Sequence, residues 1–288
     1  MFSKQLKTYK QNITLKASII IAIYKNIPFL QAILDSLRYQ TEKNFEIIIA
    51  EDGENESIKQ FIEQYSFEQP YQHLTQKDEG WRKNKAMNMA IRAAKADWLI
   101  FIDGDCVLHP RFIEMHLRYA AEETILVGKR VKLDPESSAQ LIKCSGNTKF
   151  LQKLLLQKMI WNKGDIKFIE EGIFISPDGL FGFITKMRKG KRLVGSNMSF
   201  SKQAILTING FDEDYILPAV GEDYDLNWRF AAAGFKNISV RNMAVQYHLS
   251  HIENWVNQDE NMIICQKKQL DNNFVCINGI IKRHNTKL

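Results

Sequence analysis

Short apolar runs recur along the first third of the chain, and each is followed by a segment whose apolar residues have helical spacing. The runs are rich in β-branched residues and nearly continuous, which is typical of strands buried on both faces of a parallel sheet. Because strand and helix alternate, right-handed crossovers predict a doubly wound α/β sheet. We expect strands at 18–24, 45–50, 71–75 and 98–102, and helices at 29–40, 57–65 and 82–95.

The pattern continues after Pro110 and then changes. A helix at 111–122 and a strand at 125–133 complete the first half, and regular structure is predicted again in the strand 194–200, the helix 226–233 and the strand-like segment 240–248. The residues between the two halves mix an amphipathic basic segment with Gly and Pro breaks. We therefore divide the chain into a first half at 1–133, a basic insertion at 134–193, a second half at 194–255 and a tail at 256–288.

The apolar run 98–102 ends abruptly in Asp103, Gly104 and Asp105. The carboxyl ends of the strands are where open α/β sheets bind their ligands. If the backbone stays extended through Gly104, the two carboxylates point to the same side of the strand. Carboxylate oxygens suit a hard divalent cation, Mn²⁺ or Mg²⁺, that also carries phosphate oxygens. We expect such a cation at this strand end.

Two further acidic clusters lie where a parallel sheet would bring them to the same crevice. Glu51 and Asp52 follow the second predicted strand, and Glu222 and Asp223 precede a predicted helix. Acidic residues at a helix start cap free N–H groups, and the helix dipole lowers a carboxylate pKa there. A catalytic base at this position is expected to be an ionised carboxylate positioned by geometry. Spacing alone does not choose between Glu222 and Asp223.

The basic character of the chain is local. Between Lys129 and Gly195 there are 14 Lys and Arg against 6 Asp and Glu, whereas the whole chain has a net charge of +6. Such a segment suits an anionic membrane surface or an anionic polymer. No DNA-reading motif or aromatic platform for single strands accompanies it, so we expect no nucleic-acid partner.

Composition indicates an ordinary globular protein in a reducing compartment. Hydrophobic residues make up 45% of the chain, and its four cysteines include no Cys-x-x-Cys pair. The polar first 16 residues do not resemble a secretory signal, and no apolar stretch approaches 18 residues. We expect a cytoplasmic protein, with the basic insertion as the segment for peripheral contact with the inner face of the membrane.

These motifs together resemble those of the family-2 glycosyltransferases of the GT-A fold. In the first half, the resemblance is carried by the Ser-Ile-Ile-Ile strand, by Glu51-Asp52-Gly53, where the family usually has Asp-Asp-Gly, and by Asp103-Gly-Asp105. The second half is similar to the galactosyltransferase-type module of chondroitin polymerases and β-1,4-galactosyltransferases. The resemblance covers 17–251 without the insertion, and it implies a Rossmann-like, mostly parallel sheet flanked by helices. The motifs of the second half are Gly195-Ser-Asn-Met-Ser-Phe-Ser-Lys202, Asn209-Gly-Phe-Asp212-Glu and Gly221-Glu-Asp-Tyr-Asp-Leu-Asn-Trp-Arg229.

The resemblance also implies roles for single residues. Asp105 would bind the metal together with Asp103, which would also face the ribose and sugar, and His248 is favoured over His251 as a further ligand of the metal or diphosphate. Asp223, ahead of Glu222, would be the catalytic base. The residues expected at the UDP-sugar are Tyr24 and Asp52 at the base, Asn197, and at the phosphates Lys85 of a Lys-x-x-Asn sequence, with Arg82 in reserve.

The implied activity is that of an inverting, metal-dependent glycosyltransferase. It would move a sugar from a nucleotide-sugar, with UDP-sugar favoured, to a hydroxyl of a surface glycan or a lipid-linked saccharide. The Gln-x-x-Arg-Trp signature of processive synthases is absent, which favours non-processive transfer. A nucleotidyltransferase is disfavoured because the segment after the first strand, Tyr24-Lys-Asn-Ile-Pro28, contains no glycine. A catalytically silent polysaccharide-binding module is disfavoured because all three acidic clusters are present.

Overall fold

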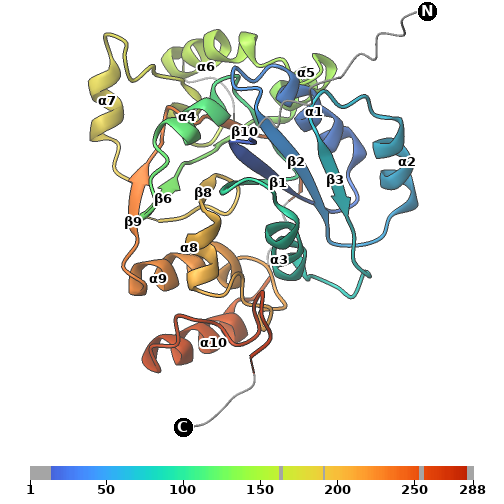
Figure 1. The fold of residues 1–288 in the computed structure, drawn as a ribbon. Coiled ribbons are helices and arrows are strands. Elements are labelled where there is room, and N and C mark those ends of the chain that lie inside the picture. Colours follow the sequence, from blue (N-terminus) through green and yellow to red (C-terminus); the bar gives the residue numbers. More distant parts are fainter. Residues whose placement is uncertain (1–13, 162–164, 191, 253–255, 284–288) are drawn as a thin grey trace, which may run out of the picture.

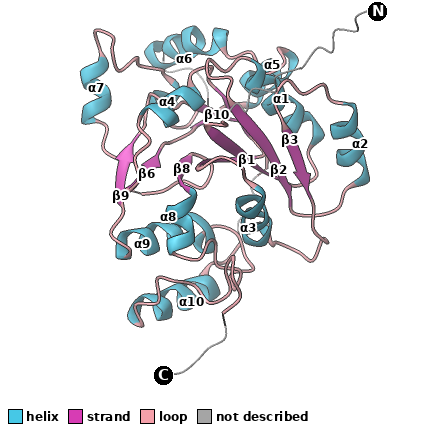
Figure 2. Ribbon diagram, in the orientation of Figure 1, coloured by secondary structure: helices cyan, strands magenta, loops and turns pink. Residues whose placement is uncertain are grey.

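The computed structural model describes residues 14–161, 165–190, 192–252 and 256–283. A seven-stranded sheet in the order β3-β2-β1-β4-β8-β6-β9 forms its centre (Figure 1, Figure 2). Of these strands, β8 runs antiparallel to its neighbours and the other pairs are parallel, which confirms the predicted mostly parallel sheet. The strands are β1 (Ala17–Ile23), β2 (Phe45–Glu51), β3 (Tyr71–Leu74), β4 (Trp98–Asp103), β6 (Thr124–Val127), β8 (Met198–Ser201) and β9 (Lys236–Ser239).

Alternate residues of β1 face two separate hydrophobic cores. Ile19 and Ile21 belong to the core on the side of α1 (Ile27–Arg38) and α2 (Glu56–Gln64), whereas Ile20 belongs to the core on the side of α3 (Lys83–Ala93). All three isoleucines are fully buried. Since both faces of the strand are covered by helices, the sequence can be apolar without alternation.

Helices from both halves of the chain complete the two layers. The α1 side also carries α4 (Phe112–Arg118), α5 (Pro135–Lys143) and α6 (Lys149–Trp161), and the α3 side carries α8 (Lys202–Thr207) and α9 (Asp225–Ala232) (Figure 1). A small second sheet has the strand order β5-β10-β7 and lies next to the end of β4. Its strands are β5 (Cys106–Leu108), β7 (Val131–Lys132) and β10 (Gln246–His248).

The prediction of a single strand at 125–133 is wrong, because this segment forms two strands, β6 and β7, that belong to different sheets. The break falls at Gly128, whose N–H donates to the carbonyl of Asn197. A Cβ at Gly128 would lie 2.2 Å from the Asn197 side chain, so this close approach requires glycine. The segment 240–248 is likewise mostly a turn. Asn242 has a φ of 61° there, and only its last three residues form β10.

The insertion and the tail contain more regular structure than the sequence predicts. Between α6 and β8 lie a 3₁₀ turn, η1 (Ile169–Gly172), and a short helix, α7 (Gly182–Met187). The tail forms α10 (Asp259–Leu270), which packs below α8 and α9 in Figure 1, and Lys268 of α10 forms an ion pair with buried Asp212. Among the described residues, no helix is both long and apolar enough to cross a lipid bilayer.

Candidate active site

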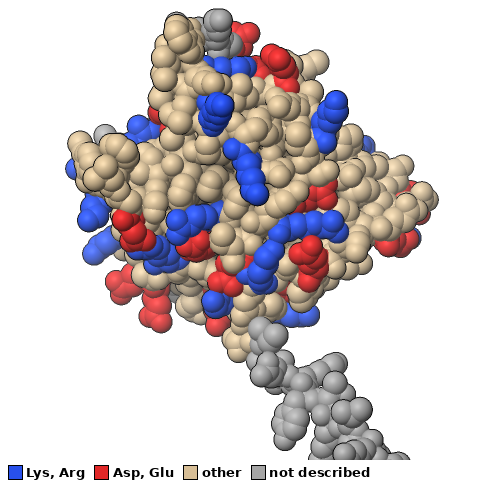
Figure 3. Space-filling model, turned by 90° about the horizontal axis from the view of Figure 1, so that it is seen from above, with Lys and Arg blue, Asp and Glu red and all other residues tan. Residues whose placement is uncertain are grey.

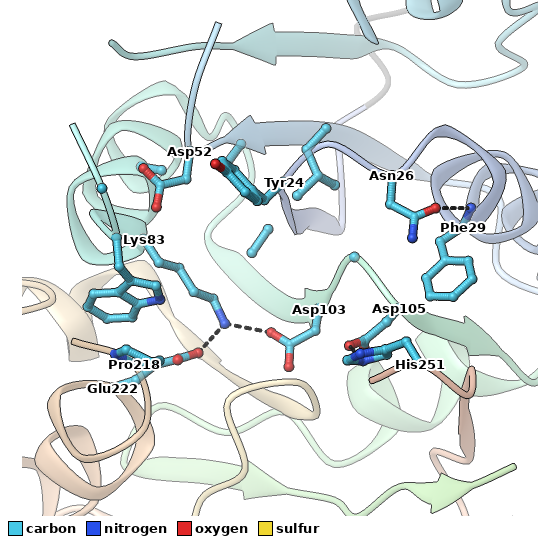
Figure 4. A pocket seen from close by; sticks show the side chains of 17 residues that line it. Tyr24, Asn26, Phe29, Asp52, Lys83, Asp103, Asp105, Pro218, Glu222 and His251 are labelled. Atoms are coloured by element: carbon cyan, nitrogen blue, oxygen red, sulfur yellow. Dashed lines mark hydrogen bonds and ion pairs between the residues drawn. The ribbon is translucent and has the colours of Figure 1, made fainter. Parts of the chain in front are cut away.

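A cavity of about 650 Å³ opens at the carboxyl ends of β1, β2 and β4 (Figure 4). Four of the six predicted acidic residues line it, namely Asp52, Asp103 and Asp105 from the first half of the chain and Glu222 from the second half. The parallel sheet therefore brings the three acidic clusters into one crevice, as the sequence predicts. The other lining residues are Ala22, Ile23, Tyr24, Asn26, Phe29, Ala50, Gly80, Trp81, Lys83, Ala86, Gly104, Pro218 and His251.

The Asp103-Gly104-Asp105 turn joins β4 to β5. A Cβ at Gly104 would lie 2.7 Å from the carbonyl oxygen of Ala22 in β1, so the turn can pass this close to the neighbouring strand only with glycine. The Asp103 carboxylate accepts hydrogen bonds from Lys83 Nζ at 2.6 Å and from Arg130 Nη1 at 3.1 Å. These two cations lie at the end of β4, where the sequence predicts only the carboxylates.

Asp105 and two histidines form a compact cluster of possible metal ligands. The Asp105 Oδ2 atom lies 3.2 Å from His248 Nε2 and 3.1 Å from His251 Nε2. One ligand atom from each residue lies within 4.8 Å of the other two. Pairing of β10 with β5 sets His248 opposite Cys106, and this pairing brings the end of the chain's second half to Asp105. Burial would raise the pKa of Asp105, but hydrogen bonds from His248 and His251 hold it well below its usual range.

Lys83 connects the two halves of the site. Its ammonium donates to Asp103 and also to Glu222, which lies just before α9 (Figure 4). Burial lowers the pKa of Lys83, but the carboxylates of Asp103 and Glu222 raise it above its ordinary value. Burial, followed by the negative charges of Asp103 and Asp223, raises the pKa of Glu222 to about 7 against the opposing effect of Lys83.

Asp223 lies beside the cavity rather than in its lining. Its carboxylate accepts a bond of 3.4 Å from the Gly195 N–H. Burial raises the pKa of Asp223, which corrects the expectation that a helix dipole lowers it. Asp223 lies in the first turn of the π-helical segment η2 (Val220–Tyr224), which runs directly into α9 at Asp225, and burial there outweighs the bond from the Gly195 N–H. Asp225 is the acidic residue in the first turn of α9, and it is paired with buried Arg229 at 2.6 Å.

The two residues of the Glu51-Asp52 pair point to different environments. Glu51 is buried, with its carboxylate 2.8 Å from His73 Nε2 and bonded to the Asn55 N–H. Asp52 lines the cavity and accepts bonds from Gln76 Nε2 at 2.6 Å and from the Arg82 N–H at 2.7 Å. Tyr24 lies on the same wall and is 55% exposed. Glu51 thus supports the wall, and Asp52 and Tyr24 form it.

Three of the predicted nucleotide-site residues do not line the cavity. Lys85 lies on α3 two residues after Lys83, which is about 200° around the helix, so the two side chains cannot share a face. The Arg82 side chain donates to the carbonyl of Trp81, and only its backbone meets Asp52. Asn197 is fully buried, and its amide bonds to the carbonyls of Lys129 and Ala244.

Three residues of the site are not indicated by the sequence motifs: Lys83, Arg130 and Trp81. Lys83 and Arg130 both contact Asp103, and Trp81 lines the cavity. No local pattern distinguishes Lys83 from Lys85. Asn84 and Asn88 on α3 are buried and donate to backbone carbonyls at 211, 212 and 221, which fixes the face that α3 turns to the second half. With α3 held in this rotation, Lys83 and not Lys85 lines the cavity.

Solved structures of similar fold include complexes with nucleotide-sugars. The chain aligns with Staphylococcus aureus TarS 1–349 in complex with UDP-GlcNAc at a TM-score of 0.58 and 14% identity, covering 89% of this chain and 67% of that one. It also aligns with the mannosyltransferase PcManGT from Pyrobaculum calidifontis in complex with GDP-Man and Mn²⁺, at a TM-score of 0.53 and 13% identity, covering 91% and 64%. The fold is therefore the GT-A fold that the sequence predicts.

Sequence relatives point to the same group of proteins. The chain is 33% identical over 111 residues to the putative glycosyltransferase EpsH of Bacillus subtilis, covering 38% of this chain and 32% of that protein. It is 26% identical over 255 residues to chondroitin synthase of Escherichia coli, covering 85% and 36%. The chain thus spans about a third of the length of these two relatives. The sequence model of Glycosyl transferase family 2 matches residues 18–187, more than half of the chain. The resemblance seen in the motifs is confirmed, and the chain belongs to glycosyl transferase family 2.

Proposed function

We propose that this chain is an inverting, metal-dependent glycosyltransferase that moves a sugar from a nucleotide-sugar, with UDP-sugar favoured, to a saccharide hydroxyl. The observation that carries the proposal is the convergence of Asp52, Asp103, Asp105 and Lys83 on one cavity at the carboxyl edge of the sheet. The solved structures of similar fold that bind UDP-GlcNAc, or GDP-Man with Mn²⁺, support a nucleotide-sugar as donor.

The wall between β1 and β2 suits a nucleoside. Tyr24 and Trp81 offer aromatic surface, and Ile23 and Ala50 offer aliphatic surface, to a flat base. Asp52 is held by Gln76 and by the Arg82 backbone, so its carboxylate is fixed in the wall before any ligand arrives. Each of its oxygens has lone pairs left to accept an N–H group of the base.

The donor set at the end of β4 fits a divalent cation. Asp105, His248 and His251 would supply one oxygen and two nitrogens, and this mixed set is compatible with Mn²⁺. Asp103 is already bonded to Lys83 and Arg130, which leaves Asp105 as the main carboxylate ligand. When bound, the cation would stabilise the negative charge that builds on the diphosphate leaving group.

Two cationic side chains of the protein would supply further positive charge at the diphosphate. Lys83 and Arg130 are cations at the same strand end, and they would neutralise part of the diphosphate charge. Asp103 orients both of them, so its own negative charge is compensated. Water exclusion by the apolar wall would strengthen these interactions.

We propose Asp223 as the base that accepts the proton of the acceptor hydroxyl. Glu222 also has a raised pKa, but its carboxylate is bonded to the Lys83 ammonium and is therefore less available to an acceptor hydroxyl. The Asp223 carboxylate accepts from backbone N–H groups, including that of Gly195 at 3.4 Å. The raised pKa of Asp223 makes it a stronger base than an exposed aspartate. A single displacement with this base inverts the anomeric centre. The acceptor would be a glycan or a lipid-linked saccharide, and transfer would be non-processive.

A donor screen tests the proposal. Thermal shifts of the whole chain would be measured with UDP-, GDP- and dTDP-sugars, each with Mn²⁺ and with EDTA, and the preferred donor would then be assayed for hydrolysis and for transfer to saccharides. We expect a Mn²⁺-dependent shift and release of the nucleoside diphosphate. Release of pyrophosphate from a nucleoside triphosphate and a sugar phosphate would indicate a nucleotidyltransferase instead. Saccharide binding without any donor shift would indicate a silent binding module.

A further inference from the structure

The segment around α7 turns apolar side chains outward. Leu180 in the turn before α7 is 87% exposed, and Phe183 and Met187 on α7 are 59% and 72% exposed. Phe183 and Met187 are four residues apart and so share one face of the helix. Gly182 and Thr185 are its buried residues. A helix normally buries its apolar face. Because no described residue covers this one, the exposed face suits contact with an apolar partner.

The segment is fixed to the protein on both sides. Asp178, just before it, pairs with Arg118 of α4 at 2.6 Å. Arg188, directly after α7, donates to buried Glu171 of η1 at 2.8 Å. These contacts hold the backbone, so the outward apolar side chains belong to a docked helix and do not result from an unattached loop.

The same segment is strongly basic. Residues 180–192 contain five Lys and Arg and no Asp or Glu. Lys186, Lys189 and Arg192 are exposed, and none of the ion pairs within the described part of the chain uses them. Figure 3 views the molecule from above Figure 1, whose upper part carries α6 and α7, and on that face Lys and Arg, with some Asp and Glu, lie among wide areas of uncharged residues.

We propose that residues 180–190, together with Arg192, dock on an anionic lipid surface. Exposed aliphatic and aromatic side chains enter the boundary between headgroups and acyl chains, and flanking Lys and Arg are attracted to anionic headgroups. A soluble anionic polymer would use the charges but would give no reason to expose Leu180, Phe183 and Met187. The proposal does not depend on the sugar-transfer reaction.

Co-sedimentation of the whole chain with vesicles tests the docking. Vesicles of phosphatidylcholine alone are compared with vesicles that also contain phosphatidylglycerol. The apolar variant is Leu180→Ser with Phe183→Ser and Met187→Ser, and the charge variant is Lys186→Gln with Lys189→Gln and Arg192→Gln. The matched control is Ile263→Ser with Leu270→Ser on α10, whose side chains are 66% and 87% exposed.

We expect the wild type and the control to bind the anionic vesicles, and we expect less binding as salt rises. Each variant should lower the partition coefficient at least about tenfold, because each removes one of the two contributions. Equal binding of the apolar variant and the wild type would overturn the proposal. The proposal would also be overturned if the wild type did not bind vesicles but formed a dimer in size-exclusion chromatography and the apolar variant did not form that dimer. Far-ultraviolet circular dichroism checks that each variant is folded.

Discussion

At the scale of single residues, the site depends on how its charges are shared. Lys83 lies between Asp103 and Glu222, so one ammonium compensates two carboxylates from opposite halves of the chain. Asp223 is next in sequence to Glu222, yet it faces the Gly195 N–H. Neighbouring carboxylates therefore have different partners, and substitution can separate their roles.

The first prediction concerns the base. Asp223→Asn keeps the shape and the bond from Gly195 but cannot accept a proton, so we expect transfer to fall 10²- to 10⁴-fold, about 3–5 kcal/mol of barrier. Glu222→Gln should cost less, because its main partner is Lys83. Steady-state kinetics with UDP binding as the control measures both. A rate within about threefold of wild type in Asp223→Asn, with a large loss in Glu222→Gln, would move the base to Glu222.

The second prediction compares two lysines of α3. Lys83→Met removes a cation from the cavity, and loss of a charged hydrogen bond of about 1.5–3 kcal/mol corresponds to a 10- to 150-fold fall in kcat/KM for the donor. Lys85→Met is the matched control, since Lys85 does not line the cavity. We expect it to stay within about threefold of wild type. Equal effects of the two substitutions would contradict the assignment of Lys83.

At the scale of elements, the sequence was informative where burial alone decides the structure. The runs at 18–24, 45–50 and 98–102 correspond to β1, β2 and β4 within about one residue, because apolar strands covered on both faces leave an unbroken signal. The sequence was less informative where one tertiary contact decides. The Asn197 carbonyl meets Gly128 and ends β6, and no local pattern reports a contact between residues so far apart.

For the candidate site, the sequence predicts which acidic clusters meet but not which basic side chains join them. The three acidic clusters meet because strand ends share an edge, and that follows from the fold. Which lysine enters the cavity depends on the rotation of α3, and that is set by Asn84 and Asn88 binding the backbone of the second half. The pKa of Asp223 is raised by burial, which is a property of the tertiary structure that helix periodicity does not predict.

The third prediction belongs to helix α4. Its residue His116 is fully buried between Ser199 and Asn197, and burial lowers the pKa of His116 to about 3. The unfolded chain takes up a proton there below about pH 6.5, and the folded chain does not, so stability is lost as pH falls. The expected loss between pH 7 and pH 5 is about 2 kcal/mol. Urea unfolding at both pH values, for wild type and His116→Gln, should show a loss smaller by that amount in the variant. Equal losses would mean that other groups cause the pH dependence.

At the scale of the whole molecule, one sheet unites the two halves of the chain. Strand β8 of the second half lies between β4 and β6 of the first half, and η2 lies beside the ends of strands from the first half. A ligand in the cavity would contact residues from Tyr24 to His251. Donor binding should therefore stabilise the whole fold rather than one lobe.

The last prediction follows from this linkage. A ligand at 100 times its Kd stabilises the folded state by about 2.7 kcal/mol, which for a chain of this size raises Tm by roughly 4–5 °C. We expect UDP with Mn²⁺ to give such a shift and UDP with EDTA to give little, because Asp105, His248 and His251 would hold the diphosphate through the cation. Asp105→Asn should remove the Mn²⁺-dependent part of the shift, and Asp271→Asn at the end of α10 should keep it. Differential scanning fluorimetry measures the shift within each protein, so a lower starting Tm in a variant does not affect the comparison. An equal shift by UDP in EDTA would show that nucleotide binding needs no cation, and Asp105 would then have to act in another way.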